Sequence, residues 1–126
     1  MMTAAIQKLN QIGVPVKDLA RAVEFYQSQL GLTLLFNTET MAFFDCGGLR
    51  LMLSLPEKEQ FAHASSVLYF EVADIDQAYA EFMERGVHFS GPPHCVVKNG
   101  ASETWMAFLE DTEGNTHAIT SDCTTA

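Results

Sequence analysis

The sequence has few basic residues. Seven Lys and Arg stand against 16 Asp and Glu in 126 residues, which gives a formal net charge of −9 at pH 7. The basic residues form no cluster that could neutralise several phosphates, so nucleic acid and anionic membrane surfaces are poor candidate partners. The acidic surface instead slightly favours a cationic ligand.

Cysteines and long apolar runs are also scarce. The three cysteines, Cys46, Cys95 and Cys123, include no C-x-x-C pair, which argues against a disulfide framework and a thiolate zinc site. No apolar stretch approaches the roughly 18 residues that span a bilayer, and residues 1–10 lack the apolar run of a signal peptide. We therefore expect a soluble cytoplasmic protein with free thiols.

What the sequence does contain is a strand-and-helix pattern that occurs twice. Residues 11–16 alternate between apolar and small or polar side chains, and Asp18 is a suitable N-cap for an amphipathic helix that ends at Gly31. The same pattern returns 56 residues later, with a strand over 66–72 and a helix that Asp74 caps. This is an internal repeat.

Each copy of the pattern continues with further strands. Gly47-Gly48 and Asn99-Gly100 are signals for tight hairpin turns. In the first copy we expect strands over residues 32–36, 41–46 and 49–55, and in the second over 94–98, 103–110 and 116–121. The fold class is therefore α+β, with a strand, a helix and three strands written twice.

Three separated segments carry a resemblance to a known family. They are V-P-V-K-D-L-A-R-A-V-E-F-Y-Q-S-Q-L-G at 14–31, V-A-D-I-D-Q-A-Y at 72–79 and A-F-L-E-D-T-E-G-N at 107–115. Together they resemble the vicinal oxygen chelate superfamily, which includes glyoxalase I, extradiol dioxygenases, methylmalonyl-CoA epimerase, fosfomycin-resistance enzymes and bleomycin-binding proteins.

The resemblance implies a single domain over residues 1–126, built from two tandem βαβββ modules. We expect the modules at about 6–56 and 66–121, with a polar linker at about 57–65. In this family the strands curl into an open, partly barrel-like mixed sheet around a cleft, and a second subunit often completes it. We therefore expect a homodimer.

In the metal-dependent members of this superfamily, four inward-facing side chains hold one divalent ion. The resemblance places these positions at Gln11, Met52, Val67 and Ala118. Only Gln11 offers an oxygen or nitrogen donor to such an ion. A divalent metal is therefore disfavoured, we expect no cofactor, and Gln11 is better suited to hydrogen-bonding a bound molecule.

Several further residues are expected to line the cleft. Arg50 alternates with buried leucines, so its guanidinium could meet an acidic group of a ligand or pair with Asp45 or Glu71. Strand alternation also requires some aromatic side chains in the cleft wall. The expected ligand-binding residues are Gln11, Arg50, Met52, Val67, Tyr69, Trp105 and Ala118.

Two polar residues are candidates for catalysis. His94 follows the stiff Gly91-Pro92-Pro93 turn, and Glu103 lies across the Asn99-Gly100 hairpin from it. A carboxylate beside an imidazole is a usual acid–base pair, although a surface ion pair on a hairpin explains the spacing equally simply. We expect His117, by contrast, to face the helix layer as a structural histidine.

These observations predict a small-molecule-binding protein of the glyoxalase and bleomycin-resistance type. Its metal site is degenerate, and its role would be to sequester a compound or confer resistance to it. One alternative is an enzyme of the same superfamily, a lyase, isomerase or dioxygenase-like protein that acts on a small carbonyl or aromatic metabolite. Another alternative is a protein-interaction or regulatory domain.

Overall fold

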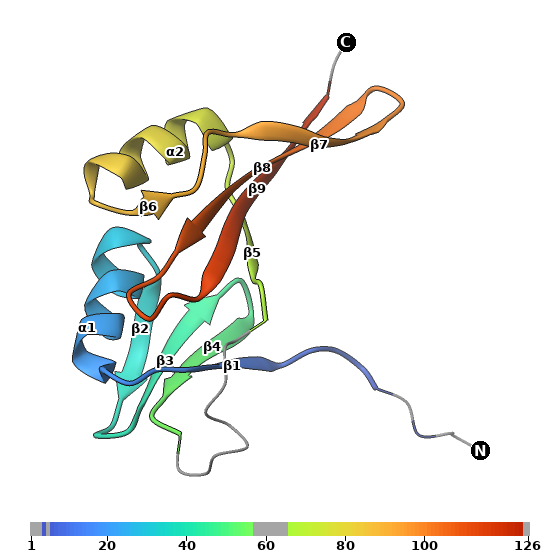
Figure 1. Cartoon of the computed structure of the whole chain (residues 1–126). Coiled ribbons are helices and arrows are strands. Elements are labelled where there is room, and N and C mark those ends of the chain that lie inside the picture. The colour runs from blue at the N-terminus through green and yellow to red at the C-terminus, as the bar shows by residue number, and fades with distance from the viewer. Residues whose placement is uncertain (1–3, 5, 57–65, 125–126) are drawn as a thin grey trace.

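Two β-sheets, each with a helical segment packed on one face, make up the chain (Figure 1). The computed structural model describes residues 4, 6–56 and 66–124. The predicted linker at 57–65 lies outside the described residues. None of the described helices is long and apolar enough to cross a membrane.

The first sheet contains four strands and receives one helical segment. Its spatial order is β1 (Gln11–Pro15), β4 (Leu49–Ser54), β3 (Met41–Cys46) and β2 (Thr33–Asn37). The helical segment consists of α1 (Leu19–Glu24) followed directly by a π-helical turn, η1 (Phe25–Gln29). Strand β1 is an edge strand that pairs in parallel with β4, so Pro15 lies where a missing N–H does no harm.

The second sheet repeats this arrangement. Its spatial order is β5 (Tyr69–Glu71), β9 (Thr116–Thr124), β8 (Ser102–Glu110) and β6 (His88–Phe89). Strand β7 (His94–Asn99) also pairs with β8. The helix of this module is α2 (Ile75–Glu84). In both sheets the first strand runs parallel to the last. The predicted α+β fold is confirmed, and both sheets remain open rather than closing into a barrel.

Local sequence signals account for most of these elements. The carboxylates of Asp18 and Asp74 each accept a hydrogen bond from the backbone N–H three residues later, at 3.1 Å, as N-caps do. Gly47 and Gly48 both have positive φ angles, 61° and 87°, which the two-residue β3–β4 hairpin requires. Leu51 and Leu53 are buried, whereas Arg50 on the same strand is exposed, as predicted.

Three elements differ from the sequence prediction by more than one residue or in geometry, and the two-residue strand β6 was not predicted. Strand β5 is shorter than residues 66–72, although the bonds from Ala118 N to Leu68 O and from Val72 N to Thr120 O extend its pairing with β9, both at 2.9 Å. Strand β9 runs three residues beyond the predicted end at 121. The first helix changes to π-helical geometry, in which Leu30 N donates to Phe25 O at 3.0 Å.

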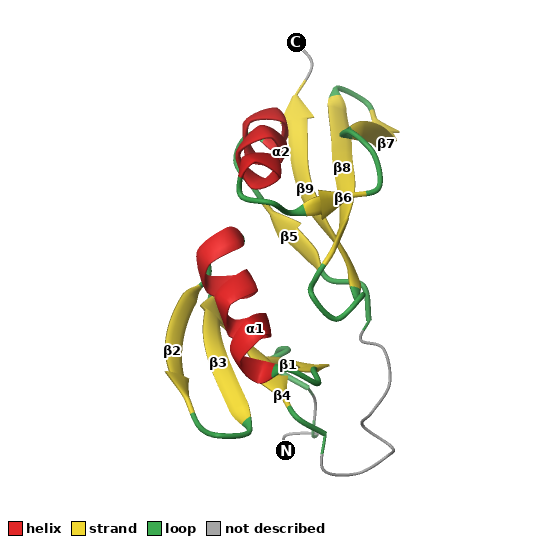
Figure 2. Ribbon diagram, turned by 60° about the vertical axis from the view of Figure 1, so that its left-hand side comes forward, coloured by secondary structure: helices red, strands yellow, loops and turns green. Residues whose placement is uncertain are grey.

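The core lies on the helix-facing sides of the sheets and is continuous between the modules. Valines of the first strand and leucines of β4 pack with residues of the second module such as Leu109 and Ile119. The segment α1–η1 lies on the side of the first sheet that faces the second module (Figure 2). Among the described residues, a helical segment therefore covers one face of each sheet, and no helix covers the other face.

Candidate functional site

Three of the predicted site residues meet on the uncovered side of the first sheet. Residues paired across a ladder share a face, so the pairs Gln11–Arg50 and Phe43–Met52 point to the same side. The Gln11 amide donates to Met52 Sδ at 3.6 Å. We call the set Gln11, Phe36, Phe43, Arg50 and Met52 the first outer face.

Two aromatic rings and one cation give this face its chemistry. Phe36 and Phe43 are stacked, with ring centroids 4.6 Å apart. The Arg50 guanidinium carbon lies 5.5 Å from the centroid of Phe43, a distance at which a cation is attracted to the ring face. Phe43 is only 9% exposed, whereas Phe36 is 51% exposed. The open Phe36 ring and the guanidinium are therefore the groups that can contact a planar ligand with an acidic group.

The uncovered side of the second sheet holds a more apolar set. Tyr69 pairs with Ala118, which pairs with Phe108. The Phe108 ring lies 6.4 Å from that of Tyr69 and 6.3 Å from that of His94. We call the set Tyr69, His94, Phe108 and Ala118 the second outer face. Val67, another predicted site residue, precedes β5 and is partly exposed.

The structure does not bring His94 and Glu103 together. His94 pairs with Met106 across the β7–β8 ladder, whereas Glu103 pairs with Lys98 and lies on the helix-facing side. Glu103 Oε1 accepts a hydrogen bond from Trp105 Nε1 at 3.0 Å, and its other oxygen lies 4.0 Å from Lys98 Nζ. The predicted His94–Glu103 pair is therefore not formed.

Trp105 also lies apart from the other predicted ligand-binding residues. It pairs with Ser121 and alternates with Phe108 along β8, so its ring packs against the core on the helix-facing side. The reason is the period of two along a strand, which sends Trp105 and Phe108 to opposite faces. Phe108 takes the outer position that the sequence assigned to the tryptophan.

The four positions that the resemblance assigns to metal ligands do not fit a divalent ion here. Gln11 and Met52 contact each other, and the buried Ala118 lies on the second sheet with no donor atom. Within the described ranges, no three His, Cys, Asp or Glu side chains are grouped as metal ligands would be. A thioether, two aliphatic side chains and one amide are not a ligand set for a hard ion.

A buried polar network links the two modules, and its extent was not apparent from the sequence. The Tyr26 hydroxyl donates to Asp111 Oδ2 at 2.6 Å and lies 2.9 Å from His117 Nε2. His117 Nδ1 accepts from Leu68 N at 3.3 Å, so the neutral ring carries its proton on Nε2 and donates it to Tyr26. His117 is fully buried, which confirms its predicted structural role.

Burial controls the charge of this network. Desolvation, helped by the negative charge of Asp111, raises the pKa of Tyr26 far above its usual range. Desolvation also lowers the pKa of His117, although Asp111 opposes that shift. At neutral pH Tyr26 is therefore a phenol and His117 a neutral imidazole. Asp111 also accepts hydrogen bonds from the backbone N–H groups of Glu113 and Asn115, both at 2.8 Å.

A cavity of about 520 Å³ lies where the first module approaches β5. Its walls include the end of the helical segment, the β3–β4 turn and part of the second outer face. Tyr69 is the only predicted ligand-binding residue among those that line it. Cys46 also lines this cavity, and burial, with the nearby Asp45 charge, raises the pKa of its thiol, so it is not an activated nucleophile.

Comparison with known proteins identifies the family. The profile of the Glyoxalase/Bleomycin resistance protein/Dioxygenase superfamily matches residues 8–119. The chain belongs to this superfamily. The resemblance seen in the three sequence segments is thereby confirmed, and the fold agrees with it.

Individual relatives are more distant. The chain is 34% identical to the uncharacterized protein YraH of Bacillus subtilis over 101 residues, which cover 69% of this chain and 79% of that protein. It is 32% identical to the metallothiol transferase FosB of Staphylococcus haemolyticus over 75 residues, or 56% of this chain and 53% of that protein. A superfamily member from Sphaerobacter thermophilus has a similar fold, with a TM-score of 0.76, 22% identity and coverage of 91% and 97%.

Proposed function

We propose that this protein binds a small planar molecule with a carboxylate or phosphate group on the first outer face, without a metal ion. The observation that carries this proposal is the environment of Arg50. Its guanidinium lies over the Phe43 ring, and no ion pair joins it to a described carboxylate, although Asp45 is its partner across the ladder. A ligand acid group would supply the missing counter-charge.

The neighbouring residues fit the same ligand. The exposed Phe36 ring, which stacks on Phe43, offers a platform for an aromatic ring, and the half-buried Gln11 amide can bond a further polar atom. The net charge of −9 favours cations at long range. Salt screens charges that lie more than about 8 Å apart at physiological ionic strength. The direct contact between a ligand anion and Arg50 therefore outweighs the long-range repulsion by the net negative charge.

We propose that a second copy of the chain completes the site. Phe36, Val67 and Tyr69 are 51%, 41% and 54% exposed on the uncovered sides of the sheets. Exposed apolar side chains grouped in this way are typical of an interface. In the dimer, the second outer face of one copy would close over the first outer face of the other and shield the ligand from water.

The proposal is tested by a binding screen of aromatic carboxylates and aryl phosphates, with thermal shift followed by calorimetry. Arg50→Gln is expected to weaken the best ligand about tenfold or more, since hydrogen bonds to charged groups contribute about 1.5–3 kcal/mol. Lys98→Gln, which changes a basic residue on β7, is the matched control and should bind normally. The proposal fails if no compound binds or if Arg50→Gln binds as tightly as the wild type.

A metal-dependent transferase is the alternative, and the similarity to the metallothiol transferase FosB favours it. It would require oxygen or nitrogen donors, which three of the four family positions lack here. Elemental analysis of the purified protein decides between the two. One equivalent of tightly held metal, released in Gln11→Ala, would favour the transferase and contradict metal-independent binding.

A further inference from the structure

The cavity beside β5 has the size of a binding site. Its volume of about 520 Å³ lies within the range of about 300–1,000 Å³ that is usual for small-molecule sites. None of its described lining residues belongs to the first outer face, and only Tyr69 belongs to the second. The walls come from the chain that follows η1, from the β3–β4 turn, from β5 and from α2, so a bound molecule would contact both modules.

Apolar side chains form the floor of this cavity. Leu49 is one of them, because it lies on the same side of β4 as the buried Leu51. All of them are only partly buried, so they keep surface that a ligand can cover. The lining side chains that pack against the core are Leu30, Leu32, Phe70, Val72 and Phe82.

Two carboxylates lie at the mouth of the cavity, on the uncovered sides of the sheets. Asp45 pairs with Thr33 across the β2–β3 ladder and with Arg50 across the β3–β4 ladder, so these three residues share the outer side of the first sheet. Glu71 alternates with Phe70 along β5 and so lies on the outer side of the second sheet. Asp45 and Glu71 are both exposed. The cavity therefore combines an apolar floor with an acidic mouth.

No cation among the described residues neutralises this mouth. No ion pair or side-chain hydrogen bond joins the carboxylate of Asp45 or Glu71 to a described residue, and none of the described lining residues is basic. Arg85 lies over an aromatic ring of the floor. Its guanidinium is already used, because it donates to Gln29 O at 3.2 Å and lies 4.0 Å from the Glu81 carboxylate.

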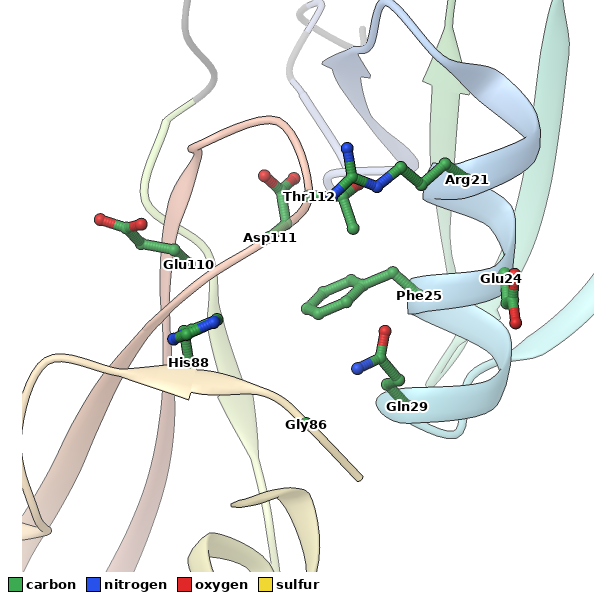
Figure 3. Close-up of a pocket in the computed structure, with 9 residues that line it drawn as sticks. All are labelled: Arg21, Glu24, Phe25, Gln29, Gly86, His88, Glu110, Asp111 and Thr112. Atoms are coloured by element: carbon green, nitrogen blue, oxygen red, sulfur yellow. The ribbon is translucent and has the colours of Figure 1, made fainter. Parts of the chain in front are cut away.

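A second cleft, of about 420 Å³, lacks this combination. It lies between α1–η1 on one side and β6 with the turn after β8 on the other (Figure 3). Phe25, its aromatic lining residue, is only 3% exposed. Figure 3 also shows the Glu110 carboxylate pointing away from Arg21 and Phe25. The second cleft thus offers a ligand little apolar surface and no converging charges, and the cavity beside β5 is the better candidate.

We propose that the cavity beside β5 binds a primary amine that carries an aromatic ring or a short apolar chain. The apolar part packs on the floor, and the ammonium group stays at the mouth, in the field of Asp45 and Glu71. One charge at one end of the ligand is sufficient, because both carboxylates lie on the open side of the cavity. An anion would be repelled there, and a hard metal ion would find no further oxygen ligands in the floor.

The test titrates the isotope-labelled protein with phenethylamine and two analogues while amide NMR shifts are recorded. Phenethyl alcohol keeps the ring without the charge, and ethylamine keeps the charge without the ring. Phenethylamine is expected to shift the amides of Gly47 and Glu71, which line the cavity. Phenethyl alcohol should bind about threefold more weakly, as expected for loss of an exposed ion pair, and ethylamine about tenfold more weakly or worse, because it buries little apolar surface.

A variant that fills the mouth locates the ligand. Thr33 is exposed, lines the cavity and begins β2, so the larger side chain in Thr33→Phe should weaken phenethylamine about tenfold or more without disturbing the core. The matched control is Thr116→Phe, a change of the exposed threonine that begins β9 and does not line the cavity. The control should bind phenethylamine as the wild type does.

A second variant tests the charge. Glu71→Gln should weaken phenethylamine about threefold and leave phenethyl alcohol unchanged. The matched control is Glu84→Gln, an exposed change on α2 outside the cavity, which should alter neither affinity. The proposal is wrong if phenethylamine does not bind, if phenethyl alcohol binds equally well, or if Thr33→Phe has no effect.

This site and the first outer face can be tested independently. Arg50 does not line the cavity, so Arg50→Gln, which should abolish tight binding of an aromatic acid, should not weaken phenethylamine. The ring of phenethylamine could instead lie on the exposed Phe36. Loss of phenethylamine binding in Phe36→Ala but not in Thr33→Phe would place the amine on the first outer face and overturn the cavity proposal.

Discussion

The two helical segments occupy equivalent places in the repeat but make different contacts with the other module. Both begin at an aspartate N-cap with the same 3.1 Å bond, and both pack on one face of their own sheet. One difference lies at a single position. Tyr26 of η1 corresponds to Phe82 of α2, 56 residues later, and the two rings differ chemically by a hydroxyl group.

That hydroxyl links the modules. Tyr26 is fully buried and bonds to Asp111 and His117 of the second module. Phe82 is only partly buried, and the Arg85 guanidinium carbon lies 5.5 Å from its ring centroid. Duplication therefore supplied two similar helices, and a polar group on one of them made it a connector between the modules.

The largest expected effect comes from removing each ring. Tyr26→Ala should lower the free energy of unfolding by about 3–5 kcal/mol, as loss of a buried aromatic side chain does, and it also leaves Asp111 and His117 without their partner. Phe82→Ala should lower it by roughly half as much or less, because that ring is partly in water. Urea unfolding followed by circular dichroism measures both.

Tyr26→Phe isolates the hydroxyl in the same experiment. Because the ring remains, Tyr26→Phe should lower the free energy of unfolding by only about 1–3 kcal/mol, the range for a buried polar group left unsatisfied. If Tyr26→Phe were as stable as the wild type, the network would not connect the modules energetically. The two helical segments would then differ in burial alone.

A second effect, smaller and dependent on pH, concerns His117. Its pKa in the folded state is lowered by burial relative to about 6.5 in the unfolded chain. Above pH 6.5 the imidazole is neutral in both states. Below pH 6.5 His117 is protonated in the unfolded chain while it is still neutral in the folded protein. The free energy of unfolding therefore falls as the pH falls from about 6.5 toward the folded-state pKa.

The variant His117→Gln removes this proton uptake and keeps an N–H donor for Tyr26. We expect the free energy of unfolding to fall less between pH 8 and pH 5.5 in the variant than in the wild type. His94→Gln, which removes an exposed histidine of the same module, is the control and should keep the wild-type slope. An equal slope in His117→Gln would mean that the buried imidazole titrates no differently in the two states.

Local features of the fold could be predicted from the sequence. Alternation placed Arg50 and Met52 opposite the buried Leu51 and Leu53, and the helix starts followed from aspartate caps. These features depend on residues a few positions apart, so a one-dimensional pattern contains them. The repeat then indicated that a second strand-and-helix unit would follow the first.

Features that depend on distant partners could not be predicted. Tyr26 fits an apolar stripe as well as any core residue, and its partners Asp111 and His117 are 85 and 91 positions away. The His94–Glu103 prediction failed for a related reason. The hairpin turn is Gly100-Ala101 rather than Asn99-Gly100, and a bulge between Cys95 and Val97 shifts the pairing again.

The smallest expected effect sharpens the comparison at the helix starts. The Glu113 carboxylate, on the turn after β8, accepts hydrogen bonds from Lys17 N at 2.8 Å and Asp18 N at 3.1 Å. Glu113 thus joins the second module to the start of α1. Among the described residues, no side chain of the first module accepts a hydrogen bond from the backbone at the start of α2. Glu113→Ala should lower stability by about 0.5–1 kcal/mol, the usual value of one or two exposed capping bonds.

The control for Glu113→Ala is Glu84→Ala, an exposed change near the end of α2 that touches neither helix start. The urea midpoint should fall in Glu113→Ala alone, and amide exchange at Lys17 and Asp18 should accelerate. If exchange accelerates while the midpoint stays fixed, the contact orders the helix start without stabilising the module interface. The interface would then be stabilised by the Tyr26 network, the shared core and the hydrogen bonds between Gln29 and Arg85, and the Glu113 contact would act on the helix start alone.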